Sequence, residues 1–181
     1  LAEAEIEYGE DPCHSIYVKF NVTDDMGKLT ALGADLSKTY FVIWTTTAWT
    51  LPGNRAISVN PEFTYALMKV ESGETYIVAK DLAEAVAKNA GIETYEIIAE
   101  LPGSELMTAQ HPLMDQESVV LCGDHVTLDA GSGCVHTAPG FGADDFNICQ
   151  KYDKAGLTHI GVPVPVNAKG VMTDERFNGV H

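Results

Sequence analysis

Short stretches with the patterning of β-strands recur along the chain. Residues 14–22 alternate between polar and apolar, which is typical of a half-buried strand, and residues 39–45 form a mostly apolar run typical of a fully buried one. A polar loop separates the two. Further strands are expected at residues 55–59, 65–70, 75–79, 94–99, 118–122 and 133–137. Residues 71–74 are expected to form a hairpin turn between two of these strands.

Helical spacing of apolar residues is found in two segments. Residues 81–89 are expected to form the first helix, with Asp81 as its N-cap and Gly91 close to its C-terminal end. Residues 142–152 are expected to form the second, with acidic residues at the N-terminal end, where the helix dipole is positive. Many short strands with two helices argue against a doubly wound parallel sheet. The pattern therefore predicts an α+β fold, with a compact β-barrel-like core and peripheral helices.

The length of the chain suits a single domain. Its 181 residues, 45% of them hydrophobic, can bury a sizeable core, and no repeat or low-complexity tract divides residues 1–181. The proline-rich residues 162–166 are expected to form an extended edge or loop. No segment has the length and apolarity needed to cross a membrane. Residues 1–8 are acidic and unlike a signal peptide, so we expect an end cut from a larger protein.

The four cysteines are widely spaced, at Cys13, Cys122, Cys134 and Cys149. There is no Cys-x-x-Cys pair to bind zinc, and the spacing does not indicate a disulfide framework. We therefore expect reduced thiols in a cytoplasmic protein. Cys134 lies two residues before His136, which would suit a nucleophile and its base. The alternation of a strand also places both on one face without catalysis, and we favour that interpretation.

The chain is strongly acidic, with 26 Asp and Glu against 11 Lys and Arg and a formal net charge of −15. A protein that binds nucleic acid by itself usually presents basic residues to the phosphates. Strong autonomous binding of nucleic acid is therefore not expected. If the ligand is a nucleic acid, most of the phosphate contacts must come from another part of a larger protein.

Two separated segments carry polar groups suited to a ligand. Residues 45–54 follow an apolar run and carry four hydroxyl groups, an amide and a Pro-Gly turn, so donors are presented rather than buried. Residues 131–146 place His136 and Asp145 nine residues apart around a bend rich in glycine and proline. A strand would deliver the histidine and the start of a helix the aspartate. We expect the two segments to form one active site.

These two segments resemble the editing domain inserted in isoleucyl-tRNA synthetase, a class I aminoacyl-tRNA synthetase. They are Thr-Thr-Thr-Ala-Trp-Thr-Leu-Pro-Gly-Asn and Gly-Ser-Gly-Cys-Val-His-Thr-Ala-Pro-Gly-Phe-Gly-Ala-Asp-Asp-Phe. The resemblance covers nearly the whole chain and implies the same barrel-like fold. Valyl and leucyl relatives usually carry Thr-Thr-Arg-Pro and no histidine at position 136, which favours the isoleucyl group. Two departures are Ala48, where proline is expected and the turn is loosened, and Phe141, where many members have histidine.

The resemblance implies roles for the two ionisable residues. Asp145 would bind the α-ammonium of an aminoacyl ester by a charge-assisted hydrogen bond. The alternative is that Asp145 is simply an acid in the first turn of a helix, where it stabilises the helix dipole. His136 would wall a pocket that admits valine and excludes the extra methylene of isoleucine. A general base or a hydrogen-bonded core histidine is the alternative. A second sieve is needed because one methylene gives limited discrimination, a limit for which this synthetase is the standard example.

The remaining expected site residues are Thr45, Thr46, Thr47, Asn54, Trp49 and Ala138. The threonines and the asparagine would hold the terminal adenosine, the ester and the attacking water, since hydroxyls and amides both stabilise an oxyanion and orient a nucleophile. A threonine run is also ordinary strand sequence. Packing is favoured over base stacking for the tryptophan.

No Gly-x-Ser-x-Gly motif or metal-ligand cluster is found in the sequence, so we expect hydrolysis by a positioned water without metal or cofactor. The identity of the proton acceptor stays open. Residues 158–161 begin like the class I His-Ile-Gly-His signature, but Val162 breaks it and its lysine-rich partner is absent. ATP-dependent activation of an amino acid is therefore not expected.

The predicted function is hydrolytic editing of valyl-tRNA(Ile), with valyl-adenylate as a further candidate substrate. The expected partners are the 3′-terminal adenosine with its valyl group and the remainder of the synthetase, with no membrane. The alternatives are a valyl or leucyl editing domain, a non-catalytic insert that docks the acceptor end, and a free-standing small-ester hydrolase.

Overall fold

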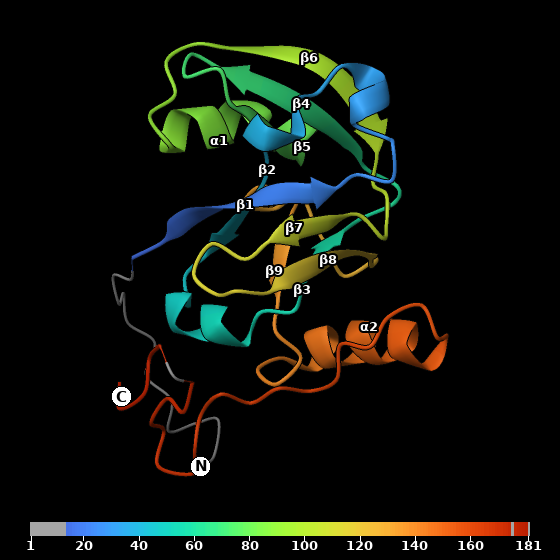
Figure 1. The fold of residues 1–181 in the computed structure, drawn as a ribbon. Coiled ribbons are helices and arrows are strands. Elements are labelled where there is room, and N and C mark those ends of the chain that lie inside the picture. Colours follow the sequence, from blue (N-terminus) through green and yellow to red (C-terminus); the bar gives the residue numbers. More distant parts are fainter. Residues whose placement is uncertain (1–13, 175, 181) are drawn as a thin grey trace, which may run out of the picture.

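The computed structural model describes residues 14–174 and 176–180. Nine strands in these ranges form one mixed sheet in the order β6-β4-β5-β2-β1-β7-β8-β3-β9 (Figure 1). Their bounds are β1 (Ile16–Asp24), β2 (Thr39–Thr45), β3 (Ala56–Val59), β4 (Thr64–Val70), β5 (Thr75–Ala79), β6 (Tyr95–Pro102), β7 (Thr108–Gln110), β8 (Glu117–Cys122) and β9 (Val135–Thr137). Residues 1–8, expected to be an end cut from a larger protein, and Cys13, expected to be a reduced thiol, lie outside the described residues.

The sheet bends round on itself, so strands from both of its halves share one core. In Figure 1, β4, β5 and β6 lie at the top, and β3, β7, β8 and β9 lie below them. The largest cluster of buried side chains draws on both groups, with Leu67 and Ile77 from the upper strands and Ile57 and Val120 from the lower ones. This shared core confirms the predicted α+β fold with a compact barrel-like centre.

Strand pairing brings the ends of β2 and β9 toward the same region. β1 pairs antiparallel with β2, and Phe20 lies opposite Phe41 at the centre of the core. β3 pairs in parallel with β8 on one side and antiparallel with β9 on the other. β3 is also packed on both faces, with Ile57 and Val59 in the main core and Ala56 against α2, so its four residues are all buried. β9 lies at the edge of the sheet.

In the described part of the chain, two α-helices pack against the sheet, and a 3₁₀ turn lies near the end of β2. α1 (Ala83–Asn89) packs through Val86 and Ala87 against β2, β4 and β5. The prediction of Asp81 as its N-cap was wrong, because a 3₁₀ turn precedes the helix and Leu82 occupies the N-cap position without a side-chain bond. Gly91 does follow the helix, with a φ of +69° that suits glycine.

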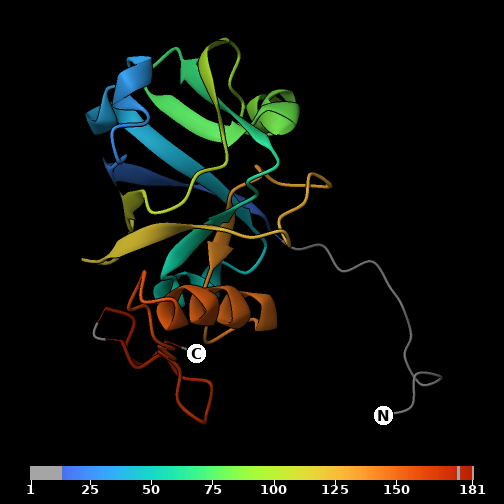
Figure 2. The ribbon, with the colours of Figure 1, turned by 90° about the vertical axis from the view of Figure 1, so that its right-hand side faces the viewer.

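The second helix, α2 (Ala143–Lys154), lies beneath the lower strands, and the C-terminal segment runs below it (Figure 2). Ile148, Cys149 and Tyr152 pack it against Ala56 and Leu121 of the sheet. The third helical element is η4 (Ala48–Gly53), a 3₁₀ turn separated from the end of β2 by Thr46 and Thr47. Both α2 and η4 start next to predicted site residues.

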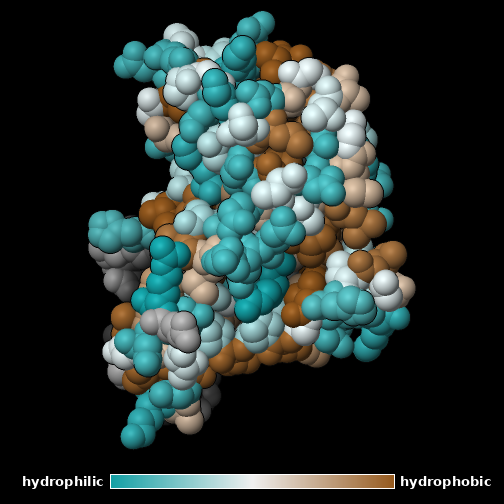
Figure 3. Space-filling model, viewed as in Figure 1, coloured by the Kyte–Doolittle hydropathy of each residue, from teal (hydrophilic) through white to brown (hydrophobic). Residues whose placement is uncertain are grey.

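The C-terminal part of the described chain is mostly irregular. Residues 162–166 form no strand apart from an isolated bridge between Val166 and Met172, which agrees with the expected extended segment. Among the described residues, no helix has both the length and the apolarity needed to span a membrane. In the view of Figure 3, hydrophilic residues cover the middle of the surface, and hydrophobic residues gather in separate patches.

Candidate active site

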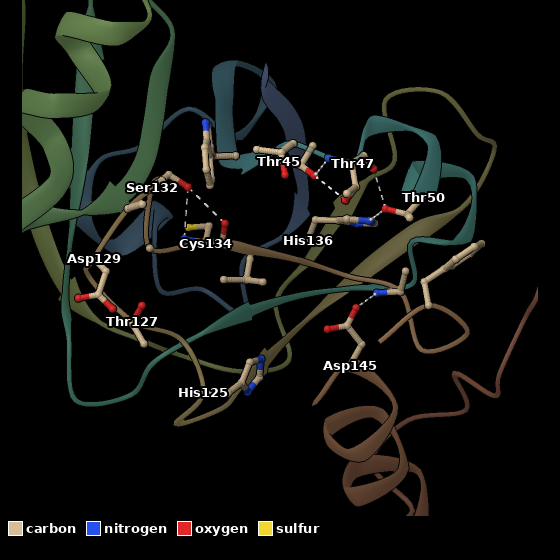
Figure 4. Close-up of a pocket in the computed structure, with 18 residues that line it drawn as sticks. Thr45, Thr47, Thr50, His125, Thr127, Asp129, Ser132, Cys134, His136 and Asp145 are labelled. Carbon is tan, nitrogen blue, oxygen red and sulfur yellow. Dashed lines mark hydrogen bonds between the residues drawn. The ribbon is translucent and has the colours of Figure 1, made fainter. Parts of the chain in front are cut away.

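A cavity of about 440 Å³ lies where the end of β2, β9 and the start of α2 meet (Figure 4). Six of the eight predicted site residues line it, namely Thr45, Thr46, Thr47, His136, Ala138 and Asp145. The first three come from one segment and the last three from the other. The structure therefore brings the two separated segments together, as expected.

The threonine segment bends sharply as it leaves the sheet. The backbone N–H of Thr47 donates to Oγ1 of Thr45 over 3.0 Å, and the two hydroxyl oxygens are 3.2 Å apart. This local bond ends the strand, because the side chain takes the place of a ladder partner. The η4 turn then brings Thr50 back to the cavity, where its hydroxyl donates to the carbonyl oxygen of Thr47 over 2.8 Å.

His136 lies in the middle of β9, opposite Ile57 of β3. Its Nε2 is 2.9 Å from Oγ1 of Thr50, and its Nδ1 is 2.7 Å from Nδ2 of Asn54. Burial, with a smaller contribution from the charge of His111, lowers the pKa of His136 to about 4. The imidazole is therefore neutral at pH 7.

Asp145 is the third residue of α2, whose N-cap is Gly142. Its Oδ2 accepts the backbone N–H of Ala138 over 2.8 Å, so it ties the start of the helix to the loop after β9. The carboxyl group lines the cavity, and Figure 4 shows its second oxygen outside this hydrogen bond. Burial raises the pKa of Asp145, and the hydrogen bond from Ala138 opposes that rise.

Two of the predicted site residues do not line this cavity. Asn54 is fully buried, and its Nδ2 donates to the carbonyl oxygen of Ala56 over 2.9 Å. It contacts His136 without lining the cavity itself. Trp49, for which packing was favoured over base stacking, is 68% exposed on the η4 turn. It lines a second, apolar cavity of about 460 Å³, and Phe141 borders both cavities.

Cys134 lacks the environment of a nucleophile. Its side chain is 2% exposed, and its Sγ lies 3.5 Å from the carbonyl oxygen of Ile77. Burial raises its pKa above that of an ordinary thiol, so the thiolate is not populated. Cys122, Cys134 and Cys149 are all free thiols, as predicted for the cysteines that the structure describes.

Several residues that line the cavity were not among the predicted site residues. Thr50, His125, Asp129 and Ser132 all belong to this group. Within residues 14–174 and 176–180, His125 is the one residue whose buried side-chain polar atom, Nε2, has no hydrogen-bond partner. The same residues contain no group of three His, Cys, Asp or Glu side chains placed to hold a metal ion. The run of hydroxyls in residues 45–54 could have singled out Thr50, whereas no local pattern marks His125.

Comparison with solved structures defines the class of the fold. The chain superposes on the P. knowlesi cytosolic leucyl-tRNA synthetase editing domain with a TM-score of 0.63 and 11% identity, covering 80% of this chain and 65% of that one. GlLeuRS-CP1 gives a TM-score of 0.62 and 20% identity over 83% of this chain and 70% of that one. The fold is therefore that of an editing domain from a class I aminoacyl-tRNA synthetase.

Comparison of sequences narrows the assignment. The chain is 52% identical over 177 residues to an isoleucine–tRNA ligase of Caldanaerobacter subterraneus, and 50% identical over 184 residues to that of Enterococcus faecalis. These matches cover 97% and 99% of this chain but 18% of each relative, so the chain spans less than a fifth of their length. No protein-family model matches it. The chain belongs to the isoleucine–tRNA ligase family, as a segment with the editing-domain fold.

Proposed function

We propose that the chain hydrolyses valine from mischarged tRNA(Ile), with valyl-adenylate as a further substrate, and that the parent synthetase supplies most of the tRNA contacts. The observation that carries this proposal is the meeting of Thr45, Thr47, His136 and Asp145 around one cavity. The formal net charge of −15 supports the division of labour, because the acidic chain is poorly suited to hold tRNA phosphates by itself.

In this proposal Asp145 binds the α-ammonium group of the aminoacyl ester. One carboxylate oxygen is held by the N–H of Ala138, which fixes the side chain, and the other is left for the ligand. A partly buried carboxylate makes a stronger charge-assisted hydrogen bond than an exposed one, since the cavity screens it less than water does. The ester bond to be hydrolysed then lies toward the threonine segment.

The threonine hydroxyls orient the attacking water and stabilise the oxyanion. The water oxygen bonds to the ester carbonyl carbon, the bond from that carbon to the ribose oxygen breaks, and the ribose oxygen ends with a proton. An aminoacyl ester is already activated, so orientation and oxyanion stabilisation supply much of the acceleration. Thr45 and Thr47 lie close enough, with hydroxyls 3.2 Å apart, to act on one water.

His136 sets the size of the amino-acid pocket. Its ring is held from two sides, by Asn54 and Thr50, so it cannot turn away from a larger side chain. Exclusion by a fixed wall can reject isoleucine more strongly than an unfilled pocket rejects valine, because overlap of atoms costs more than a lost contact. Valine would therefore be accepted and isoleucine rejected.

A panel of esters tests this proposal against its alternatives. The full-length synthetase and the 181-residue chain are assayed with valyl-, isoleucyl-, threonyl- and norvalyl-tRNA substrates. The proposal predicts fastest hydrolysis of the valyl ester and a gain of isoleucyl hydrolysis in His136→Ala. Preference for threonyl or norvalyl esters would favour a valyl or leucyl specificity. Binding without any hydrolysis would identify a docking insert, and equal hydrolysis of esters lacking adenosine would identify a small-ester hydrolase.

A further inference from the structure

An unbroken run of hydrogen bonds leads from the buried strand β8 to the threonine segment. It joins, in order, Ser118, Asn54, His136, Thr50 and Thr47. The side chains of Ser118 and Asn54 are fully buried, whereas the last three residues line the cavity. Because each of these groups has a fixed set of donors and acceptors, the position of every proton in the run can be worked out.

The amide of Asn54 fixes the direction of the run. Its Nδ2 lies 2.9 Å from the carbonyl oxygen of Ala56, which can only accept, so this atom is the amide nitrogen and not the oxygen. Its Oδ1 can only accept, so the hydroxyl of Ser118 donates to it. Both ends of the amide are therefore held, and the second N–H of Asn54 points to His136.

This amide determines the tautomer of His136. Nδ1 lies 2.7 Å from Nδ2 of Asn54, which only donates, so Nδ1 accepts and carries no proton. In the neutral ring the proton is then on Nε2, which donates to Oγ1 of Thr50 over 2.9 Å. The hydroxyl of Thr50 in turn donates a hydrogen bond to the carbonyl oxygen of Thr47. Every donor in the run points from β8 toward the threonine segment.

We propose that Ser118 and Asn54 are positioning residues that hold His136 neutral with its proton on Nε2, so that the ring is a fixed wall of the cavity and does not take the proton of the attacking water. This inference rests on the proposed function. The lone pair of Nδ1 is occupied by Asn54, and Nε2 already carries a proton. The proton that water releases therefore reaches the departing ribose oxygen without passing through His136.

The surroundings of His136 also oppose its protonation. A proton on Nδ1 would face the N–H of Asn54, and burial stabilises the neutral ring. The other titratable group that acts on it is His111, whose Nε2 is 2.8 Å from the carbonyl oxygen of Leu51 and whose pKa is itself lowered by burial. Two buried neutral histidines thus support the segment that carries the threonines.

The tautomer can be measured directly by nitrogen NMR of the imidazole groups in the ¹⁵N-labelled 181-residue chain, with His136→Gln used to assign the signals. We expect an unprotonated Nδ1 and a protonated Nε2 for His136. The ring should not titrate between pH 8 and about 5.5, although an ordinary histidine titrates at about 6.5. A proton on Nδ1, or titration close to the ordinary value, would overturn the inference.

The role of Ser118 is tested with a matched control. Ser118→Ala removes the donor to Asn54, while Ser58→Ala removes an equally buried hydroxyl, whose oxygen lies 2.7 Å from that of Thr137. Ser118→Ala is expected to give a mixture of His136 tautomers and about a tenfold lower kcat/KM for valyl-tRNA(Ile), whereas Ser58→Ala stays within about twofold. Equal behaviour of the two variants in both measurements would overturn the inference.

The substitution Asn54→Asp is expected to reverse the direction of the hydrogen bond at Nδ1 of His136. Asn54→Asp keeps the shape of the side chain but presents two acceptor oxygens, so it is expected to draw a proton onto Nδ1 of His136. An unchanged tautomer in folded Asn54→Asp would overturn the assignment. If the chain shows the predicted tautomers but neither it nor the full-length synthetase releases valine, the hydrogen-bond run is supported and the hydrolytic function fails.

Discussion

Replacing Asp145 with asparagine removes one negative charge from the cavity and leaves the shape of the side chain. The asparagine oxygen can still accept the N–H of Ala138, which Oδ2 of Asp145 accepts over 2.8 Å, so the start of α2 stays tied to the loop after β9. What is lost is the charge that we propose pairs with the α-ammonium of the substrate. Hydrogen bonds to charged groups contribute about 1.5–3 kcal/mol, so kcat/KM for valyl-tRNA(Ile) is expected to fall about 10- to 150-fold.

The pH dependence gives a second readout of the same substitution. Burial raises the pKa of Asp145 above the ordinary carboxyl value, and a protonated carboxyl group cannot pair with the ammonium. Activity of the unsubstituted protein should therefore be lost as the pH falls through that raised pKa. Asp145→Asn has no group to titrate there, so its lower activity should not show this step.

The assay is single-turnover deacylation of valyl-tRNA(Ile) by the full-length synthetase, with urea denaturation to confirm that each variant is folded. Asp144→Asn is the matched control, because Asp144 is also an acid in the first turn of α2 but is exposed and does not line the cavity. It should stay within about twofold of the parent. Equal losses in both variants, or full activity in Asp145→Asn, would refute the role of Asp145 as the ammonium anchor.

Cys134, His136 and Gly133 each provide a further test. Cys134→Ala should keep deacylation within about threefold, since its buried thiol is not ionised; a loss of several orders of magnitude in the same assay would restore the nucleophile. The pKa of His136 is about 4 in the folded protein, below the value of about 6.5 expected in the unfolded chain. As the pH falls from about 6.5 to 4, the unfolded chain therefore takes up the proton while the folded protein does not, and the free energy of unfolding should fall by about 3 kcal/mol. Urea denaturation of His136→Gln should show a shallower decline over this range, and an identical decline would contradict the burial. Gly133→Ala should lower the free energy of unfolding by about 2 kcal/mol or more, since Gly133 has a φ of +75° and an added Cβ would lie 2.3 Å from the Cβ of Ala79. Unchanged urea denaturation would show that the loop before β9 can move aside.

Local patterning predicts most of the sheet, because the strands that it marks are buried on at least one face. The runs at β1, β2, β4 and β5 all contain residues of the main core, so alternation or continuous apolarity records their burial. β7 was not predicted, since it has three residues and only Ala109 of these is buried. Its position depends on pairing with β1 and β8, which no local signal specifies.

The candidate site was predictable to the extent that its residues lie in two compact segments. The surroundings of Asn54 were not, because Pro52 and Gly53 just before it are typical of an exposed turn. In the structure Asn54 is enclosed, since Ser118 of β8 and His136 of β9 meet its side chain from either side. Its predicted contact with substrate therefore becomes a contact with a residue of the cavity wall. Contacts of this kind depend on which strands become neighbours.

The proposed editing of valine is tested most directly by comparing the rate of valine release from valyl-tRNA(Ile) with the rate of isoleucine release from isoleucyl-tRNA(Ile). Both rates are measured in single turnover with the full-length synthetase that carries this segment and with its Asp145→Ala form. Rapid release of valine, slow release of isoleucine, and loss of the rapid reaction in the variant are expected. Equal release of both amino acids, or valine release that does not depend on Asp145, would contradict the proposal.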